Sequence, residues 1–76
     1  MMNHKIFTKR LRSARLERDW SQETLAAKAG TFQSYISALE QGKRPSIEAT
    51  TLFRLARALG VSAEWLAGAE EADPVP

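Results

Sequence analysis

The sequence predicts an all-α fold in which five short helices pack around one small core. Ala, Leu, Glu, Arg and Lys, which favour helices, dominate the chain, and no run of β-branched residues indicates a strand. Apolar residues recur three or four positions apart, a spacing that places them on one face of a helix. Glycines follow these periodic stretches, and no proline precedes Pro45. Together these observations predict helices joined by short connections.

The first helix is expected from about Ile6 to Arg18. Phe7, Leu11 and Ala14 form its apolar stripe. Trp20 follows and is large enough to close an edge of the core.

The second helix is expected from Gln22 to Ala29. Ser21 is a suitable N-cap, although Thr24 stands where a full capping box would have Glu or Gln. Gly30 ends the helix, since glycine adopts positive φ at a helix C-terminus.

Three further helices follow after short connections. Ile36 and Leu39 face inward from the third helix. Gly42 ends the third helix and Gly60 the fourth, and Trp65 lies in the last. The expected ranges are about Gln33–Gln41, Glu48–Leu59 and Ser62–Ala67.

Length and composition exclude several classes of protein. The 76 residues suit one domain, which we assign to residues 1–68, with a flexible acidic tail at residues 69–76. The absence of cysteine excludes a disulfide framework and a thiolate metal site. His4 is the only histidine, so we expect no metal, no cofactor and no catalytic site. No apolar run approaches the ~20 residues of a membrane span, and the first residues lack the apolar stretch of a signal peptide, so we expect a cytoplasmic location and no membrane contact.

The charged residues are unevenly distributed along the chain. Residues 1–44 carry nine basic and four acidic side chains, whereas residues 45–76 carry two basic and five acidic ones. A basic first half favours a polyanionic partner, and an acidic end favours avoidance of that partner. An ordinary solvated helix surface remains an equal explanation of this charge pattern taken alone.

A helix-turn-helix is indicated where the second and third helices meet. The small Ala26 lets the two helices approach closely, and Gly30 permits the tight bend between them. Ile36 and Leu39 bury one face of the third helix, which leaves its other face outward. Such a face can enter the major groove of DNA.

Three separated stretches carry a resemblance to a known family. They are WSQETLAAKAG at 20–30, YISALEQGKRP at 35–45 and LARALGVSAEWL at 55–66. In this order and spacing they resemble the Cro/CI-type (XRE family) phage repressors, over about residues 7 to 68. The resemblance implies a compact five-helix lambda-repressor-like DNA-binding domain that binds double-stranded operator DNA as a dimer.

The resemblance also implies roles for individual residues. Arg15 and Glu40 match a structural ion pair. The expected phosphate contacts are Ser21, Gln22, Lys43 and Arg44. The expected base-reading residues are Gln33, Ser34, Ser37 and Ala38, and Phe32 is counted with them although it departs from the family pattern.

The sequence departs from the family pattern in three places. Phe32 stands where the family prefers Ser or Thr, so either Thr31 caps the third helix one residue early or Phe32 makes an apolar contact, for example with a thymine methyl group. Asp19 occupies a turn position often held by Gly. The segment Ser46–Thr51 is about two residues longer than usual, which leaves the start of the fourth helix open.

The function predicted from these features is that of a sequence-specific transcriptional regulator. We expect a repressor, bacterial or phage-encoded and associated with the nucleoid, that binds a palindromic operator as a homodimer. Large apolar residues near the chain end suggest a dimer interface around Val61, Trp65 and Leu66. The alternative is an antitoxin or accessory regulator whose main partner is another protein, although residues 69–76 are short for a partner-binding extension.

Overall fold

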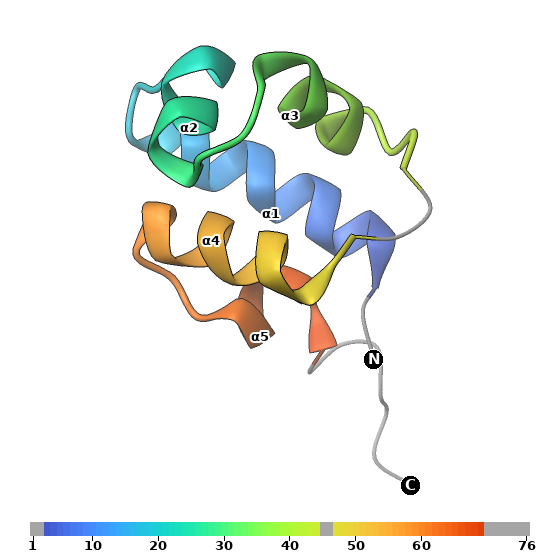
Figure 1. Cartoon of the computed structure of the whole chain (residues 1–76). Helices are drawn as coiled ribbons and strands as arrows, with labels where there is room; N and C mark the ends of the chain where they lie inside the picture. Colours follow the sequence, from blue (N-terminus) through green and yellow to red (C-terminus); the bar gives the residue numbers. More distant parts are fainter. Residues whose placement is uncertain (1–2, 45–46, 70–76) are drawn as a thin grey trace, which may run out of the picture.

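The computed structural model describes residues 3–44 and 47–69, and within them it contains five α-helices and no strand (Figure 1). This confirms the predicted fold class. The helices are α1 (His4–Glu17), α2 (Gln22–Ala29), α3 (Gln33–Glu40), α4 (Ala49–Leu59) and α5 (Ala63–Ala67).

The predicted helix ends are close to the observed ones, and the differences follow from capping. Helix α1 begins two residues earlier than expected because the side chain of Asn3 accepts a hydrogen bond from the Ile6 amide at 3.1 Å. Glu48 and Ser62 precede α4 and α5 as N-caps rather than forming their first turns. The predicted tail beyond Ala69, and the Pro45–Ser46 part of the longer connection, lie outside the described residues.

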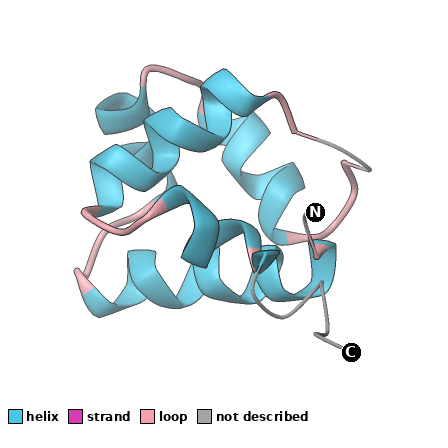
Figure 2. Ribbon diagram, turned by 90° about the horizontal axis from the view of Figure 1, so that it is seen from below, coloured by secondary structure: helices cyan, strands magenta, loops and turns pink. Residues whose placement is uncertain are grey.

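The core is formed by one apolar face of every helix. Helix α2 packs against α3 and α4, α4 packs against α5, and α1 packs against both α3 and α5. Figure 2 shows this arrangement from below, with helices on all sides of the centre. The largest fully buried side chains are Phe7, Leu11, Leu25, Ile36, Leu55, Leu59 and Leu66.

The end of α5 closes onto the start of α1. The amide of Asn3 donates to the carbonyl oxygen of Ala67 at 2.9 Å. Gly68 turns the chain with φ of 71°, and a methyl group there would lie 2.8 Å from Cγ2 of Ile6. The two ends of the domain are therefore tied together by backbone contact.

Burial corrects one sequence-based prediction about α5. Leu66 is completely buried in the core, so its side chain cannot contact a second molecule. Its assignment to a dimer interface was wrong, because α5 turns this position toward the other helices rather than toward solvent.

Candidate nucleic-acid interface

The α2–α3 unit is shaped by a single left-handed residue. Gly30 ends α2 with φ of 72° and ψ of 37°, a conformation that costs glycine little. The amide of Thr31 donates back to the carbonyl oxygen of Ala26 at 2.9 Å, which closes the end of α2. Helix α3 begins only two residues later, so the two helices form the predicted helix-turn-helix at one end of the molecule (Figure 1).

The outward face of α3 carries the predicted base-reading residues. Ile36 and Leu39 are buried beneath the helix and set its rotation. Gln33 and Ser34 are exposed as a result, and Ser37 and Ala38 are half-buried at the same surface. Sequence reasoning missed the exposed Gln41, whose side-chain amide donates to Oγ of Ser37 at 2.8 Å. Its position one helical turn after Ser37 was the available signal.

A chain of side-chain hydrogen bonds runs from the interior of the domain to this face. Arg15 donates from Nε and an Nη atom to both carboxylate oxygens of Glu40, at 2.6 and 2.8 Å. Gln22 donates from Nε2 to Oε1 of Glu40 at 3.1 Å. Gln33 in turn donates from Nε2 to Oε1 of Gln22 at 2.7 Å. The first residue of α2 and the first residue of α3 are therefore held side by side.

The Arg15–Glu40 contact has the bidentate geometry of a strong ion pair. The two side chains are only 10% and 5% exposed, and Arg15 also donates to the Trp20 carbonyl oxygen at 2.8 Å. The hydrogen bond to Glu40 raises the pKa of Arg15 above its usual value, outweighing the opposing effect of burial. Because its pKa is raised, the Arg15 guanidinium stays protonated throughout the neutral range, and its contribution to stability is lost only as the pH rises through that pKa.

The two helix N-termini differ in how they are capped. Oγ of Ser21 accepts from the Thr24 amide at 3.0 Å, as predicted for an N-cap. Phe32, with extended φ and ψ of −114° and 150°, is the N-cap of α3 and offers no side-chain acceptor. Thr31 therefore does not cap α3. Of the two alternatives for this position, an apolar contact made by Phe32 is the one that remains.

Basic residues flank the end of α3. Lys43 and Arg44 are exposed in the connection that follows α3, in the segment predicted to contact phosphates. The guanidinium carbon of Arg44 lies 4.8 Å from the centroid of the Tyr35 ring, a cation–π contact that positions it beside α3. Tyr35 was not singled out from the sequence, because only the folded connection brings Arg44 back over its ring.

The opposite end of the molecule carries the other predicted contact residues. Trp65 is 37% exposed, and the Arg10 guanidinium stacks on its ring at 4.8 Å while donating to its carbonyl oxygen. Val61 is half-buried and lines an open hollow on α4 and α5, with Phe53, Ala56, Arg57, Ala63 and Glu64. Phe53 is 61% exposed and was not recognised from the sequence as a surface residue. Its position off the apolar stripe of α4 was the available signal.

Residues 3–44 and 47–69 contain no group of three or more His, Cys, Asp or Glu placed to hold a metal ion. None of the helices in the same ranges has both the length and the apolar character needed to cross a membrane.

Comparisons with known proteins agree with this geometry. The helix-turn-helix family model matches residues 11–66. An uncharacterized HTH-type transcriptional regulator, y4dJ of Sinorhizobium fredii, is 47% identical over 49 residues, covering 63% of this chain and 61% of that protein. The HTH-type transcriptional regulator PrtR of Pseudomonas aeruginosa is 44% identical over 66 residues, covering 87% of this chain and 25% of PrtR. The chain thus spans about three fifths of one relative and a quarter of the other.

A solved structure gives the same result for the fold. The master regulator for biofilm formation SinR of Bacillus subtilis, solved in complex with DNA, superposes with a TM-score of 0.75 at 30% sequence identity, covering 79% of this chain and 95% of that one. With the family model matching most of the chain, the protein belongs to the helix-turn-helix family of the Cro/CI (XRE) type, a family of DNA-binding domains of transcriptional regulators.

Proposed function

We propose that this protein is a sequence-specific transcriptional regulator, a repressor that inserts α3 into the major groove of a palindromic operator. The outward face of α3 is the observation that carries the proposal. It presents Gln33, Ser34, Ser37 and Ala38 on a helix whose other side is anchored by Ile36 and Leu39. SinR, a protein of the same fold, was solved in complex with DNA, which supports DNA as the ligand of this domain.

Gln33 is the principal base-reading residue in this proposal. One of its side-chain N–H groups donates to Gln22, which leaves its carbonyl oxygen and its second N–H for a ligand. One acceptor beside one donor matches the N6 and N7 edge of adenine in the major groove. The hydroxyl groups of Ser34 and Ser37 and the methyl group of Ala38 contribute the neighbouring contacts to base edges.

The phosphate contacts lie on both sides of α3 in this proposal. Ser21 and Gln22 contribute from the N-terminus of α2, where free amide groups favour an anion. Gln22 retains a second side-chain N–H beyond the one that it donates to Glu40. Lys43 and Arg44 contribute from the other end of α3, and the contact of Arg44 with Tyr35 pre-orients its charge.

Substitutions at the two kinds of contact test this assignment. Gln33→Ala is expected to weaken binding to the preferred site by ~1–3 kcal/mol and to relax the preference at one base position. Lys43→Ala is expected to weaken binding to every duplex alike and to reduce the salt slope by about one unit. An unchanged base preference in Gln33→Ala would show that this face of α3 does not read the sequence.

Homodimerisation belongs to the same proposal, because one domain of this size contacts only one half-site. Two half-sites about one helical turn apart require two copies related by a two-fold axis. The surface that supports this is the α4–α5 hollow, where Phe53 projects beside Val61 and Ala63. Val61 and Trp65 are the sequence-predicted residues that we assign to this interface; one face of the Trp65 ring is covered by Arg10.

The proposal also includes the location of the protein, its domain boundaries and its mode of action. We place it in the cytoplasm, bound to the nucleoid, with residues 1–68 as the DNA-binding domain and residues 69–76 as an acidic tail. It acts by occupying a promoter and excluding polymerase, with no cofactor, metal or enzymatic reaction. A protein partner as the main ligand is the competing possibility, and selection of binding sites from a random duplex pool separates the two.

A further inference from the structure

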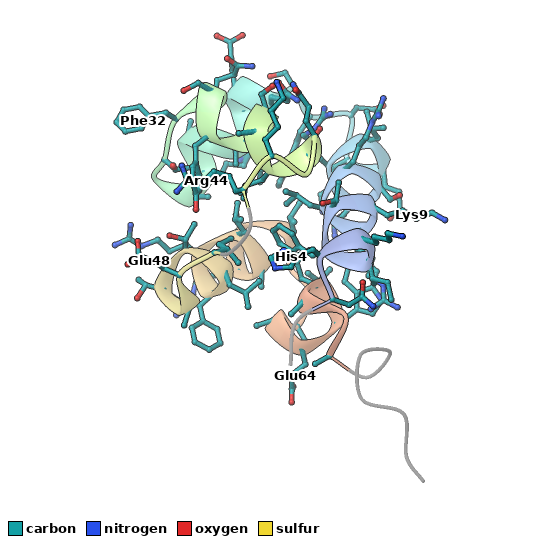
Figure 3. The ribbon with its side chains drawn as sticks, turned by 90° about the vertical axis from the view of Figure 1, so that its right-hand side faces the viewer. His4, Lys9, Phe32, Arg44, Glu48 and Glu64 are labelled. Carbon is teal, nitrogen blue, oxygen red and sulfur yellow. The ribbon has the colours of Figure 1, made fainter. Side chains whose placement is uncertain are left out.

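Phe32 is the most exposed of the large apolar side chains among the described residues. It is 77% exposed, compared with 61% for Phe53, 50% for Leu16 and 37% for Trp65. Its ring extends away from the helices, on the side of the molecule opposite Lys9 (Figure 3). A ring held in water adds nothing to the core, so the fold itself does not require phenylalanine here.

The local structure does not require phenylalanine at this position either. Phe32 is the N-cap of α3, where Ser, Thr, Asp or Asn would bind a free amide, and its side chain makes no such bond. Its backbone already accepts from the amides of Tyr35 and Ile36, both at 3.1 Å, as any residue could. The ring therefore replaces a favourable cap without contributing to the helix.

The position of the ring indicates its ligand. Phe32 directly precedes Gln33, and the N-terminal residues of a recognition helix are the ones that contact base edges. Among the groups that base pairs display in the major groove, the C5-methyl group of thymine is the apolar one. An exposed ring at this end of α3 is matched by that methyl group rather than by the polar atoms beside it.

We propose that Phe32 packs on the C5-methyl group of a thymine in each half-site and so determines specificity at that base pair. The inference rests on the proposed function, because it requires α3 to lie in the major groove. Gln33 reads its base through polar atoms, whereas Phe32 reads a neighbouring one through apolar contact. Burying one methyl group corresponds to about a fourfold gain in affinity for each half-site.

Deoxyuridine provides a direct test, because it lacks only the methyl group and keeps every hydrogen-bonding atom of thymine. The preferred duplex is compared with duplexes in which each thymine is replaced in turn, symmetrically in both half-sites. The protein is expected to lose about fourfold per half-site at one thymine position. Phe32→Ser is expected to bind the thymine and deoxyuridine duplexes equally at that position, and its serine can cap α3, which keeps the helix formed.

Leu16→Ser is the matched control, since it also removes an exposed apolar side chain but from α1. It should retain the full preference for thymine. A protein that binds its site specifically yet shows no thymine preference overturns the role of Phe32 and leaves the proposed function standing. The role of Phe32 is also overturned if Phe32→Ser keeps the preference for thymine over deoxyuridine. The same holds if Phe32→Ser weakens binding to all duplexes equally, which would indicate that Phe32 contacts sugars. If no duplex is bound specifically at all, the proposed function fails, and this inference fails with it.

Discussion

Arg15 and Glu40 link the interior of the domain to the outward face of α3. The pair joins α1 to the end of α3, and Gln22 connects the Glu40 carboxylate to Gln33. Because both charges are almost fully buried, removal of either partner leaves the other without compensation. The pair therefore matters for stability and for the placement of the residues that we assign to base reading.

Single and double substitutions of Arg15 and Glu40 measure how much the pair contributes to stability. Arg15→Met and Glu40→Leu are each expected to lower the free energy of unfolding by about 3 kcal/mol or more. The double variant is expected to recover most of this loss, because two apolar side chains of similar size need no charge compensation. Urea denaturation of the three variants measures the coupling, and strictly additive losses would argue against a buried, mutually dependent pair.

Asp19 is the one described non-glycine residue with positive φ, at 56°, in the turn between α1 and α2. The left-handed conformation costs most L-residues roughly 1–2 kcal/mol, and aspartate tolerates it better than alanine. Asp19→Gly is expected to be more stable than Asp19→Ala by about that amount, with the natural residue between them. Thermal unfolding ranks the three proteins, and equal stability of the glycine and alanine variants would exclude strain at this turn.

The roles of individual residues could be predicted from the sequence only at positions that match the family motif. The positions of Arg15, Glu40 and Asp19 relative to the helix-turn-helix were sufficient to assign the pair and the unusual turn. The Gln22–Gln33 bond and the contact of Arg44 with Tyr35 were not predicted. Both depend on the angle at which one helix meets the next segment, and spacing along the chain does not determine that angle.

At the scale of elements, the closure of α5 on α1 depends on a residue without a side chain. Gly60 and Gly68 both end helices with φ near 70°, but their surroundings differ. A methyl group at Gly60 would meet no neighbouring atom, whereas one at Gly68 would lie within 3 Å of Ile6. The two positions therefore separate backbone strain from close packing.

Alanine substitutions at the two glycines measure these effects independently. Gly60→Ala is expected to cost roughly 1–2 kcal/mol from the left-handed conformation alone. Gly68→Ala adds an overpacking cost of about 1–3 kcal/mol, because Ile6 and α5 must move apart. If the two variants unfold at the same urea concentration, α5 and α1 do not pack closely at this point.

The ranges of the helices could largely be predicted from the sequence. Which face of each helix is exposed to solvent was harder to predict. Hydrophobic period and caps predicted α2 with its observed bounds and α3 to within one residue. They did not distinguish the buried Leu66 from the partly exposed Trp65, because a helix of five residues is too short for its period to define a face. Asn3 was missed because a cap near a chain end carries no apolar pattern.

At the scale of the whole molecule, binding to a palindromic operator requires two copies, which we expect to face each other across α4 and α5. Phe53 lines the same hollow as Val61 and Ala63 and is 61% exposed, so a two-fold arrangement can bury the rings of both copies between the two hollows. Arg57 and Glu64 line the same hollow with opposite charges. We propose that in that arrangement Arg57 pairs with the partner's Glu64.

Association measurements test this surface. Phe53→Glu is expected to weaken dimerisation by ~2 kcal/mol or more, as for a central aromatic anchor. Leu16→Glu, an exposed apolar position on α1, is the control and should leave association unchanged. Arg57→Glu should weaken association, and adding Glu64→Arg should restore it. A protein that sediments as a monomer at high micromolar concentration, with and without DNA, rules out the proposed surface.

Selection of binding sites from a random duplex pool, followed by a salt titration of the selected site, tests whether α3 reads a DNA sequence. We predict an enriched palindrome with half-sites about one helical turn apart, since two copies of α3 would enter successive major grooves on one face of the duplex. Affinity for that site should fall with salt because we assign phosphate contacts to Lys43 and Arg44, yet its preference over random DNA should persist. An unenriched pool, with binding that depends only on salt, would contradict the proposed function and would direct attention to a protein partner.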